Sequence, residues 1–236
     1  MNTLWQDLRF AMRTLAHTPG FALVAVLALA LGTGANSAAF SMVHALLLRP
    51  LEFAHLDRMV WVWGDAPKLG IKSLGISAAD LRDFQALSRS FTRLEAWRTR
   101  YVTLGGSGDP ENLTCAEITP GWFAMLSTAP ALGRTFRADE AQPGADGAVL
   151  LGHGLWVRRF GADPTIVGRT VPLDGRPCTI AGVMSRDFDF PKGTDLWTPF
   201  APGPELLQRR DLRTLSVVGL MAPGVSRAAA EADLDG

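Results

Sequence analysis

The sequence predicts an α+β protein: one N-terminal transmembrane helix, followed by a mixed α/β domain with short strands, hairpins and a few helices. Three observations support this prediction. Residues 21–48 contain no Asp, Glu, Lys or Arg. Residues 49–236 alternate short apolar runs with Gly, Pro, Asn and Asp, a pattern typical of strands joined by turns. This second part is also long enough to bury a sizeable core.

The uncharged stretch has the length of a membrane-spanning helix. A hydrocarbon core of about 30 Å needs roughly 20 apolar residues, and residues 21–48 as one helix would be about 42 Å long. Residues 21–31 are all apolar. Pro19-Gly20 precedes the stretch and Arg49-Pro50 follows it. We therefore expect a transmembrane helix over residues 19–48.

Two other interpretations fit the same stretch. A weakly basic leader, an apolar run and the small residues 32–39 follow one another in the order of a secretory signal peptide. A helix buried in a protein core is the other alternative. Against a signal peptide, the sequence becomes apolar again directly after the small residues. Against a core helix, a buried helix of this length without any charge is unusual.

Residues 1–18 predict an amphipathic helix at the membrane interface. Apolar residues recur at helical spacing, and Arg9 and Arg13 share a different face. A helix that packs against protein would have the same pattern. Within the span, Gly32, Asn36 and Ala39 at i, i+4 and i+7 form a face on which another membrane helix could pack closely. A less apolar patch in a lone span is the alternative for these three residues.

The first elements of the second part are strands on either side of a helix. The Val- and Trp-rich residues 58–64 predict a strand, and residues 70–75 predict a loop. Ser77, with Asp80 three residues later, resembles a capping box and predicts a helix to about residue 94. Its expected core stripe consists of Leu81, Phe84, Leu87, Phe91 and Leu94.

Hairpins and short helices are predicted for the rest of the chain. Strands over residues 97–104 and 111–119 flank a glycine-rich turn, and strands over 166–173 and 177–184 flank the type I′ turn signal Asp174-Gly175. The remaining expected elements are short helices at 120–126 and 154–160, the latter ended by Gly161, strands at 148–151, 195–200 and 214–221, and a last helix capped by Ser226.

The cysteines and charges limit the chemistry that the chain can perform. Cys115 and Cys178 are the only cysteines; a disulfide and two free thiols both fit, because geometry decides between them. No Cys-x-x-Cys motif supports redox catalysis or a zinc site. Lys+Arg and Asp+Glu are 23 each, so no basic field indicates nucleic acid.

Catalytic motifs are absent from the sequence. It contains no P-loop and no His-Glu-x-x-His motif, and its histidines are His17, His44, His55 and His153. The Leu-Gly-His-Gly sequence around His153 is similar to an esterase oxyanion loop, but no Gly-x-Ser-x-Gly accompanies it. Asp187 and Asp189 alternate with aromatic residues, as exposed carboxylates of an edge strand would. We therefore predict no enzyme, no cofactor and no metal.

Several segments, taken in order, resemble one family. They are MNTLWQDLR at 1–9, PGF at 19–21, LALGTGAN at 29–36, LLRPL at 47–51, ALGRTF at 131–136, LWVRRFG at 155–161, IVGRTV at 166–171, AGVM at 181–184 and APGVS at 222–226. The order resembles the N-terminal part of MacB/FtsX-type ABC-transporter permeases, most closely the duplicated orphan permeases.

The resemblance implies a specific organisation in the cell inner membrane. It implies a cytoplasmic N-terminus, one span, and a MacB-like periplasmic core domain over residues 49–236 with two subdomains, one inserted at roughly 130–200. The arginines that flank the span are balanced, so charge alone does not set this orientation. Family members carry three more spans after the domain and often a second copy of the whole unit. Because the last helix stops soon after Ser226, we expect a chain truncated at its C-terminus.

The expected function follows from the same resemblance. The chain would be the permease of a MacB-like exporter, coupling ATP hydrolysis by a separate ABC ATPase to movement of the periplasmic domain. Its partners would be that ATPase, a second copy of the permease or of itself, and the lipid bilayer. The alternative is a single-span, membrane-anchored binding or sensor module in the periplasm.

Overall fold

The computed structural model describes residues 19–43, 55–66, 70–106 and 108–235 of the chain. The chain divides into two compact units, Met1–Glu52 and Phe53–Gly236. In the first unit, helix α2 (Pro19–Val43) begins at a proline, which suits the first turn of a helix. The predicted interfacial helix at 1–18 and the last residues of the predicted span lie outside the described residues.

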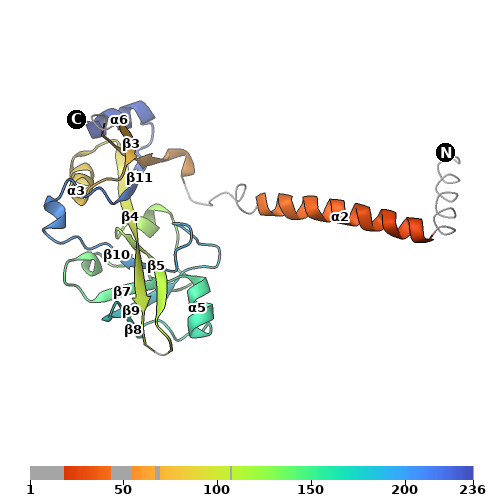
Figure 1. Cartoon of the computed structure of the whole chain (residues 1–236). Helices are drawn as coiled ribbons and strands as arrows, with labels where there is room; N and C mark the ends of the chain where they lie inside the picture. The colour runs from red at the N-terminus through yellow and green to blue at the C-terminus, as the bar shows by residue number, and fades with distance from the viewer. Residues whose placement is uncertain (1–18, 44–54, 67–69, 107, 236) are drawn as a thin grey trace. The chain divides into compact units, whose positions relative to one another are not determined.

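Helix α2 is a continuous 25-residue helix (Figure 1). It leaves large apolar side chains exposed, among them Leu23, Val24, Leu29 and Leu31. Over the residues that the structure describes, no helix meets the length and apolarity required of a membrane span. The span at 19–48 therefore stays a prediction.

The second unit contains one large mixed sheet. Its strands are β1 (Met59–Val62), β4 (Phe91–Leu104), β5 (Glu111–Ile118), β6 (Leu132–Gly133), β7 (Gly147–Leu151), β8 (Thr170–Leu173), β9 (Arg176–Val183), β10 (Leu196–Pro199) and β11 (Ser216–Met221). The order is β1-β11-β4-β5-β10-β7-β9-β6, and β8 pairs with both β4 and β9. Pairing is parallel for β5 with β10 and for β7 with β9, and antiparallel elsewhere.

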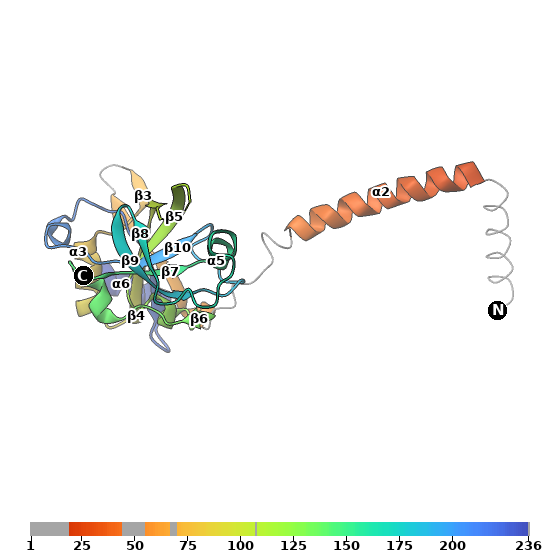
Figure 2. The same ribbon diagram turned by 90° about the horizontal axis from the view of Figure 1, so that it is seen from below.

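Part of this sheet closes into a ring. Because β8 pairs with β4 at Leu104 and Leu173, the strands β4-β5-β10-β7-β9-β8 return to their starting point (Figure 2). The amide of Gly105 also donates to the carbonyl of Pro172 at 3.0 Å. The ring encloses an apolar core that includes Leu113, Leu151, Ile180 and Leu196.

Strand β4, with 14 residues, is the longest described strand and links the separate cores of the unit. Its first part contributes Leu94 and Ala96 to a core with helix α3 (Ala78–Leu87) and β11. Trp97 belongs to a second core around Trp122 and Trp197. Val102 and Leu104 lie in the ring core. Figure 1 shows β4 running from the region of α3 at one end of the unit to β8 and β9 at the other.

The remaining helices follow the local signals in the sequence. Ser77 caps α3 by accepting from the Asp80 amide at 3.0 Å. Helix α5 (His153–Phe160) ends at Gly161, whose φ of 60° is left-handed. Ser226 accepts from the Ala229 amide at 3.2 Å at the start of α6 (Arg227–Asp235). Helix α4 is Trp122–Met125, and 3₁₀ turns lie at Leu56–Arg58, Ala138–Ala141 and Leu206–Gln208.

The helix predicted to reach residue 94 is wrong in its second half. Helix α3 ends at Leu87, and Phe91 and Leu94 lie on β4, paired with β11. The reason is distant in sequence: a carboxylate oxygen of Asp233 accepts from the Arg89 and Ser90 amides, both at 2.9 Å. These bonds hold the amides outside a helix.

Two further local predictions have different outcomes. The predicted loop at 70–75 is wrong, because β3 (Ile71–Leu74) pairs with β2 (Gly64–Ala66). The type I′ turn is confirmed: Asp174 and Gly175 have φ angles of 49° and 76°. Asp174 also accepts from the Thr103 amide at 2.8 Å, which ties this turn to β4.

The ring of strands holds the two cysteines apart. Both cysteines are free. Cys115 lies on β5 and Cys178 on β9. Two strands separate β5 from β9 in either direction around the ring: β10 and β7 on one side, and β4 and β8 on the other. With strands about 4.8 Å apart, opposite walls lie roughly 10 Å or more apart, too far for a disulfide. The division of 49–236 into two subdomains stays a prediction.

Candidate functional site

The predicted helix-packing residues lie on α2. Gly32, Asn36 and Ala39 share a face of this helix by their spacing. Gly32 and Asn36 are exposed, and a Cβ built on Gly32 would have no atom within 4 Å. No contact in the described part of the chain uses this face at Gly32, so its packing role stays a prediction.

The residues with possible catalytic chemistry do not converge. Among the described residues, no group of three or more His, Cys, Asp and Glu side chains could hold a metal ion. His153 is the first residue of α5, and its ring lies edge-on to Trp156 at 5.5 Å. Asp189 accepts from the Gly193 amide at 2.8 Å in a turn, so the edge strand expected around Asp187 and Asp189 is wrong.

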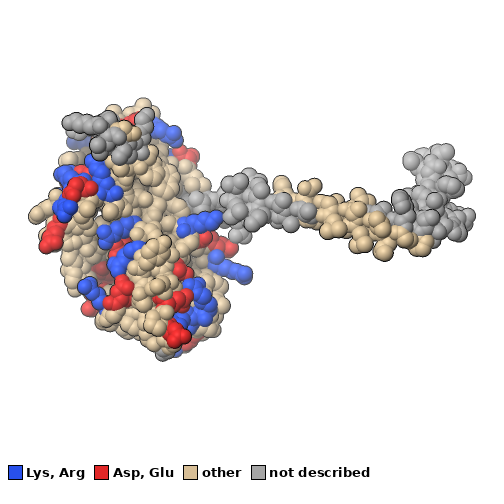
Figure 3. All heavy atoms as spheres, viewed as in Figure 1, with Lys and Arg blue, Asp and Glu red and all other residues tan. Residues whose placement is uncertain are grey.

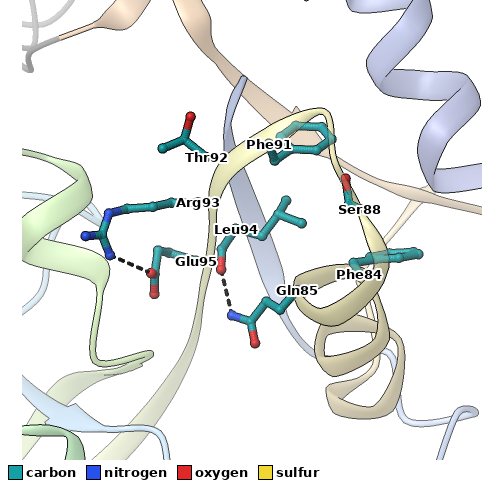
Figure 4. A pocket seen from close by; sticks show the side chains of 8 residues that line it. All are labelled: Phe84, Gln85, Ser88, Phe91, Thr92, Arg93, Leu94 and Glu95. Atoms are coloured by element: carbon teal, nitrogen blue, oxygen red, sulfur yellow. Dashed lines mark hydrogen bonds and ion pairs between the residues drawn. The ribbon is translucent and has the colours of Figure 1, made fainter. Parts of the chain in front are cut away.

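The strongest candidate site lies between α3 and β4. Two adjoining cavities, of about 190 and 340 Å³, share Gln85 and Glu95 as lining residues. Figure 4 shows the residues that line the smaller one: Gln85 on α3 points toward the Leu94 backbone, whereas Arg93 and Glu95 lie on the side of β4 away from α3. The Gln85 side-chain amide donates to the Leu94 carbonyl at 2.7 Å, which fixes the helix to the strand.

Glu95 is the chemically distinctive residue of this site. It is one of few charged side chains that are buried, with 7% of its surface exposed. Thr119 donates its hydroxyl to Glu95 Oε2 at 2.5 Å and accepts from the Ala96 amide at 2.9 Å. Arg93 approaches Oε1 only to 3.9 Å. A Cβ on Gly121 would collide with this carboxylate, so glycine leaves the space that Glu95 occupies.

The environment of Glu95 raises the proton affinity of its carboxyl group. Burial raises the pKa of this carboxyl above its usual value, while the Thr119 hydrogen bond, the Arg93 charge and the Gly121 backbone oppose the shift. The result is a carboxyl group of raised proton affinity next to a cavity. A carboxyl group in this position suits ligand binding or conformational control.

A second feature joins the C-terminal helix to the start of β4. Asp233 on α6 accepts from the Ser88 hydroxyl at 2.5 Å as well as from the Arg89 and Ser90 amides. These hydrogen bonds, first from Ser88 and then from the Ser90 backbone, lower the pKa of Asp233 to about 2. We call this group the α6 latch. It connects α6 to the strand that runs into the ring.

The surface has aromatic residues on one edge and mixed charges elsewhere. Trp61 on the edge strand β1 and Trp63 just after this strand are both about half exposed, and their rings stack with centroids 5.6 Å apart. Arg100 on β4 lies between Glu117, at 2.9 Å, and Asp174, at 2.5 Å. Figure 3 shows both signs of charge interspersed over the visible face. This pattern gives no strong field of one sign.

Comparison with known proteins places the chain in a family. The model of the MacB-like periplasmic core domain matches residues 22–236. A relative from Pseudomonas syringae pv. syringae (strain B728a), the "Probable syringafactin export ATP-binding/permease protein SyfD", is 26% identical over 177 residues. That match covers 72% of this chain and 25% of the relative, so the chain spans about a quarter of the relative's length.

Solved structures share the fold. A domain assigned to a permease of Porphyromonas gingivalis has a TM-score of 0.59 and 18% identity, covering 75% of this chain and 81% of that one. The periplasmic region of MacB from Actinobacillus actinomycetemcomitans has a TM-score of 0.55 and 14% identity, and the match covers 75% of this chain and 79% of that one. The extracellular domain of the noncanonical ABC-type transporter YknZ from Gram-positive bacteria has a TM-score of 0.52 and 15% identity, and the match covers 74% of this chain and 86% of that one.

These likenesses confirm the resemblance found in the sequence and the mixed α/β class of the second unit. The family match extends over most of the chain, from within α2 to the end of α6. The chain belongs to the MacB-like periplasmic core domain family of ABC-transporter permeases.

Proposed function

We propose that this chain is the membrane subunit of a MacB-like ABC exporter and transmits ATP-driven movement into its periplasmic domain. The family match over residues 22–236 is the observation that carries the proposal. The name of the Pseudomonas relative, an export ATP-binding/permease protein, supports an export system that uses ATP. In this proposal, ATP is hydrolysed by a separate ABC ATPase that acts on this chain.

In this proposal, residues 19–48 cross the cell inner membrane with the N-terminus in the cytoplasm, and residues 49–236 lie in the periplasm. The absence of charge in residues 21–48 and the exposed apolar side chains of α2 support a lipid environment. Gly32, Asn36 and Ala39 would face another membrane helix, contributed by a second copy of the chain or by another permease.

The second unit has features suited to transmitting movement. The α6 latch fixes one helix to the loop that begins β4. From there β4 passes through each apolar core and ends in the closed ring. A displacement of α6 or α3 would therefore reach the ring through one hydrogen-bonded strand, since packed interiors have low compressibility. Within residues 49–236, the inserted subdomain at about 130–200 would supply β7, β8, β9 and β10 to the ring, and β4 and β5 would come from the rest of the unit.

Purification from the native membrane tests this function. We expect the tagged full-length chain, extracted in mild detergent, to bring down an ABC ATPase and vanadate-sensitive ATP hydrolysis. Gly32→Leu should weaken this assembly, because the bulky side chain fills the proposed packing face. Gly34→Leu is the matched control, since Gly34 lies on another face of α2 and is equally open. Purification without any ATPase or second permease would contradict the proposal and favour a single-span binding or sensor module.

A further inference from the structure

We propose that the cavity beside Glu95 binds a protonated aliphatic amine, with the ammonium group on the Glu95 carboxylate and the alkyl chain along the apolar wall. The inference does not depend on the proposed transport function. It rests on a buried carboxylate, a cavity that reaches it, and the chemistry of the lining residues.

The larger cavity provides the space and the apolar wall. Its volume of about 340 Å³ lies at the lower end of the range for small-molecule sites. The residues around it come from α3, from β4 at Glu95, from the loop between β5 and α4, from the 3₁₀ turn at Ala138–Ala141 and from residues 200–207. Leu81, Pro120, Phe200 and Leu207 supply apolar surface, which would remove an alkyl chain from water.

Glu95 supplies a negative charge that its neighbours only partly compensate. The side chains that line the two cavities carry three charges, those of Glu95, Arg82 and Arg93. Arg93 is half exposed, and its guanidinium group is 3.9 Å from the Glu95 carboxylate. The guanidinium group of Arg82 is 3.6 Å from the carboxylate of Asp83, a residue that does not line the cavity. Because an incompletely paired buried charge is costly, a cation in the cavity would form a charge-assisted hydrogen bond with Glu95.

The lining favours an organic cation over a metal ion. The side chains around the larger cavity offer one carboxylate, one hydroxyl and the Gln85 amide oxygen, fewer than the 6–8 oxygen ligands that Ca²⁺ takes. Thr119 donates its hydroxyl proton to Glu95 Oε2. Oε1 lies beside Gly121 and 3.9 Å from Arg93, so an ammonium group would take the place of Arg93 at this oxygen. An ammonium group matches one carboxylate oxygen, and the apolar wall matches the methylene groups that follow it.

Ligand-observed NMR tests the proposal with n-butylammonium as the probe and the full chain in lipid nanodiscs. We expect saturable binding in the millimolar range near neutral pH, and at least tenfold weaker binding of n-butanol, which lacks the charge. Glu95→Gln should weaken butylammonium binding at least tenfold. Glu205→Gln, which removes an exposed carboxylate near the same cavity but outside its lining, should leave binding unchanged.

A second variant keeps the test decisive if Glu95→Gln does not fold. Arg93→Gln removes the competing cation from a half-exposed position, and we expect it to tighten butylammonium binding several-fold. Equal binding of butanol and butylammonium, no saturation above empty nanodiscs, or no effect of Arg93→Gln would each overturn the proposal. So would a folded Glu95→Gln protein that binds as tightly as the wild type.

Discussion

Gly121→Ala tests the geometry of the Glu95 site most sharply. Gly121 has a φ of −80°, which alanine adopts freely, so the change meets no backbone penalty. Replacing glycine by alanine at such a position normally stabilises a protein by about 0.4–1 kcal/mol, through the unfolded chain. Here the new methyl group would collide with the Glu95 carboxylate. The carboxylate must move and lose its hydrogen bond from Thr119.

The expected magnitude follows from that hydrogen bond. A buried hydrogen bond left unmade costs about 1–3 kcal/mol, which exceeds the gain from alanine. We expect Gly121→Ala to destabilise the full chain in detergent micelles by roughly 0.5–2 kcal/mol in urea unfolding followed by circular dichroism. With Glu95→Ala already present, the same change should become neutral or stabilising, because nothing then occupies the space.

The matched control is a glycine-to-alanine change at a position with free space. Gly154→Ala lies within α5, where the new Cβ meets only Arg158 at 3.8 Å, and should stabilise by about 0.5–1 kcal/mol. If Gly121→Ala has the same effect with and without Glu95, the two residues do not compete for space, and the description of the site is wrong.

Three further predictions concern titration and redox state. Burial raises the pKa of Glu95, so the folded state binds the proton of this carboxyl group more tightly than the unfolded state does. The free energy of unfolding should therefore fall as the pH rises above 4.5 through the folded pKa. Glu95→Gln should abolish this pH dependence in urea unfolding. The pKa of Asp233 is lowered to about 2, so the α6 latch should stabilise above pH 3.8 and weaken as pH falls toward about 2. Asp233→Ala should remove this pH dependence of stability and speed hydrogen exchange at the Arg89 and Ser90 amides. Unchanged exchange at these two amides would contradict the α6 latch. Because both cysteines are free, dithiothreitol should leave the unfolding midpoint of the wild type unchanged; a lowered midpoint would indicate a disulfide.

Elements with a local signal were predictable from the sequence. Ser77 marks the start of α3, Gly161 the end of α5, and Asp174-Gly175 the turn between β8 and β9. In each case the residues that fix the backbone are neighbours in the chain. The family resemblance was predictable as well, because its segments keep their order along the sequence.

Features that depend on distant residues were not predictable in this way. The end of α3 is set by Asp233, far along the chain, while the apolar spacing of Phe91 and Leu94 continues the helical pattern. The ring depends on pairing between β4 and β8 and between β5 and β10, which no local pattern encodes.

The Glu95 site also escaped prediction. Glu95 fell in the gap between the helix expected to reach about residue 94 and the strand expected from residue 97. Nothing in the sequence relates it to Thr119 or Gly121. A glutamate between Leu94 and Ala96, both apolar, was the only signal. Its meaning required the cavity and the burial that folding creates.

The central claim is that the second unit faces the periplasm behind a membrane-spanning helix. The direct measurement is thiol labelling of Tyr101→Cys, at a side chain that is 78% exposed, with Cys115 and Cys178 replaced by alanine. A membrane-impermeant maleimide added to intact spheroplasts should label this cysteine, while Asn2→Cys should react only after lysis. Labelling of Tyr101→Cys only after lysis would contradict the proposed topology and, with it, the proposed transmission of movement to the periplasm.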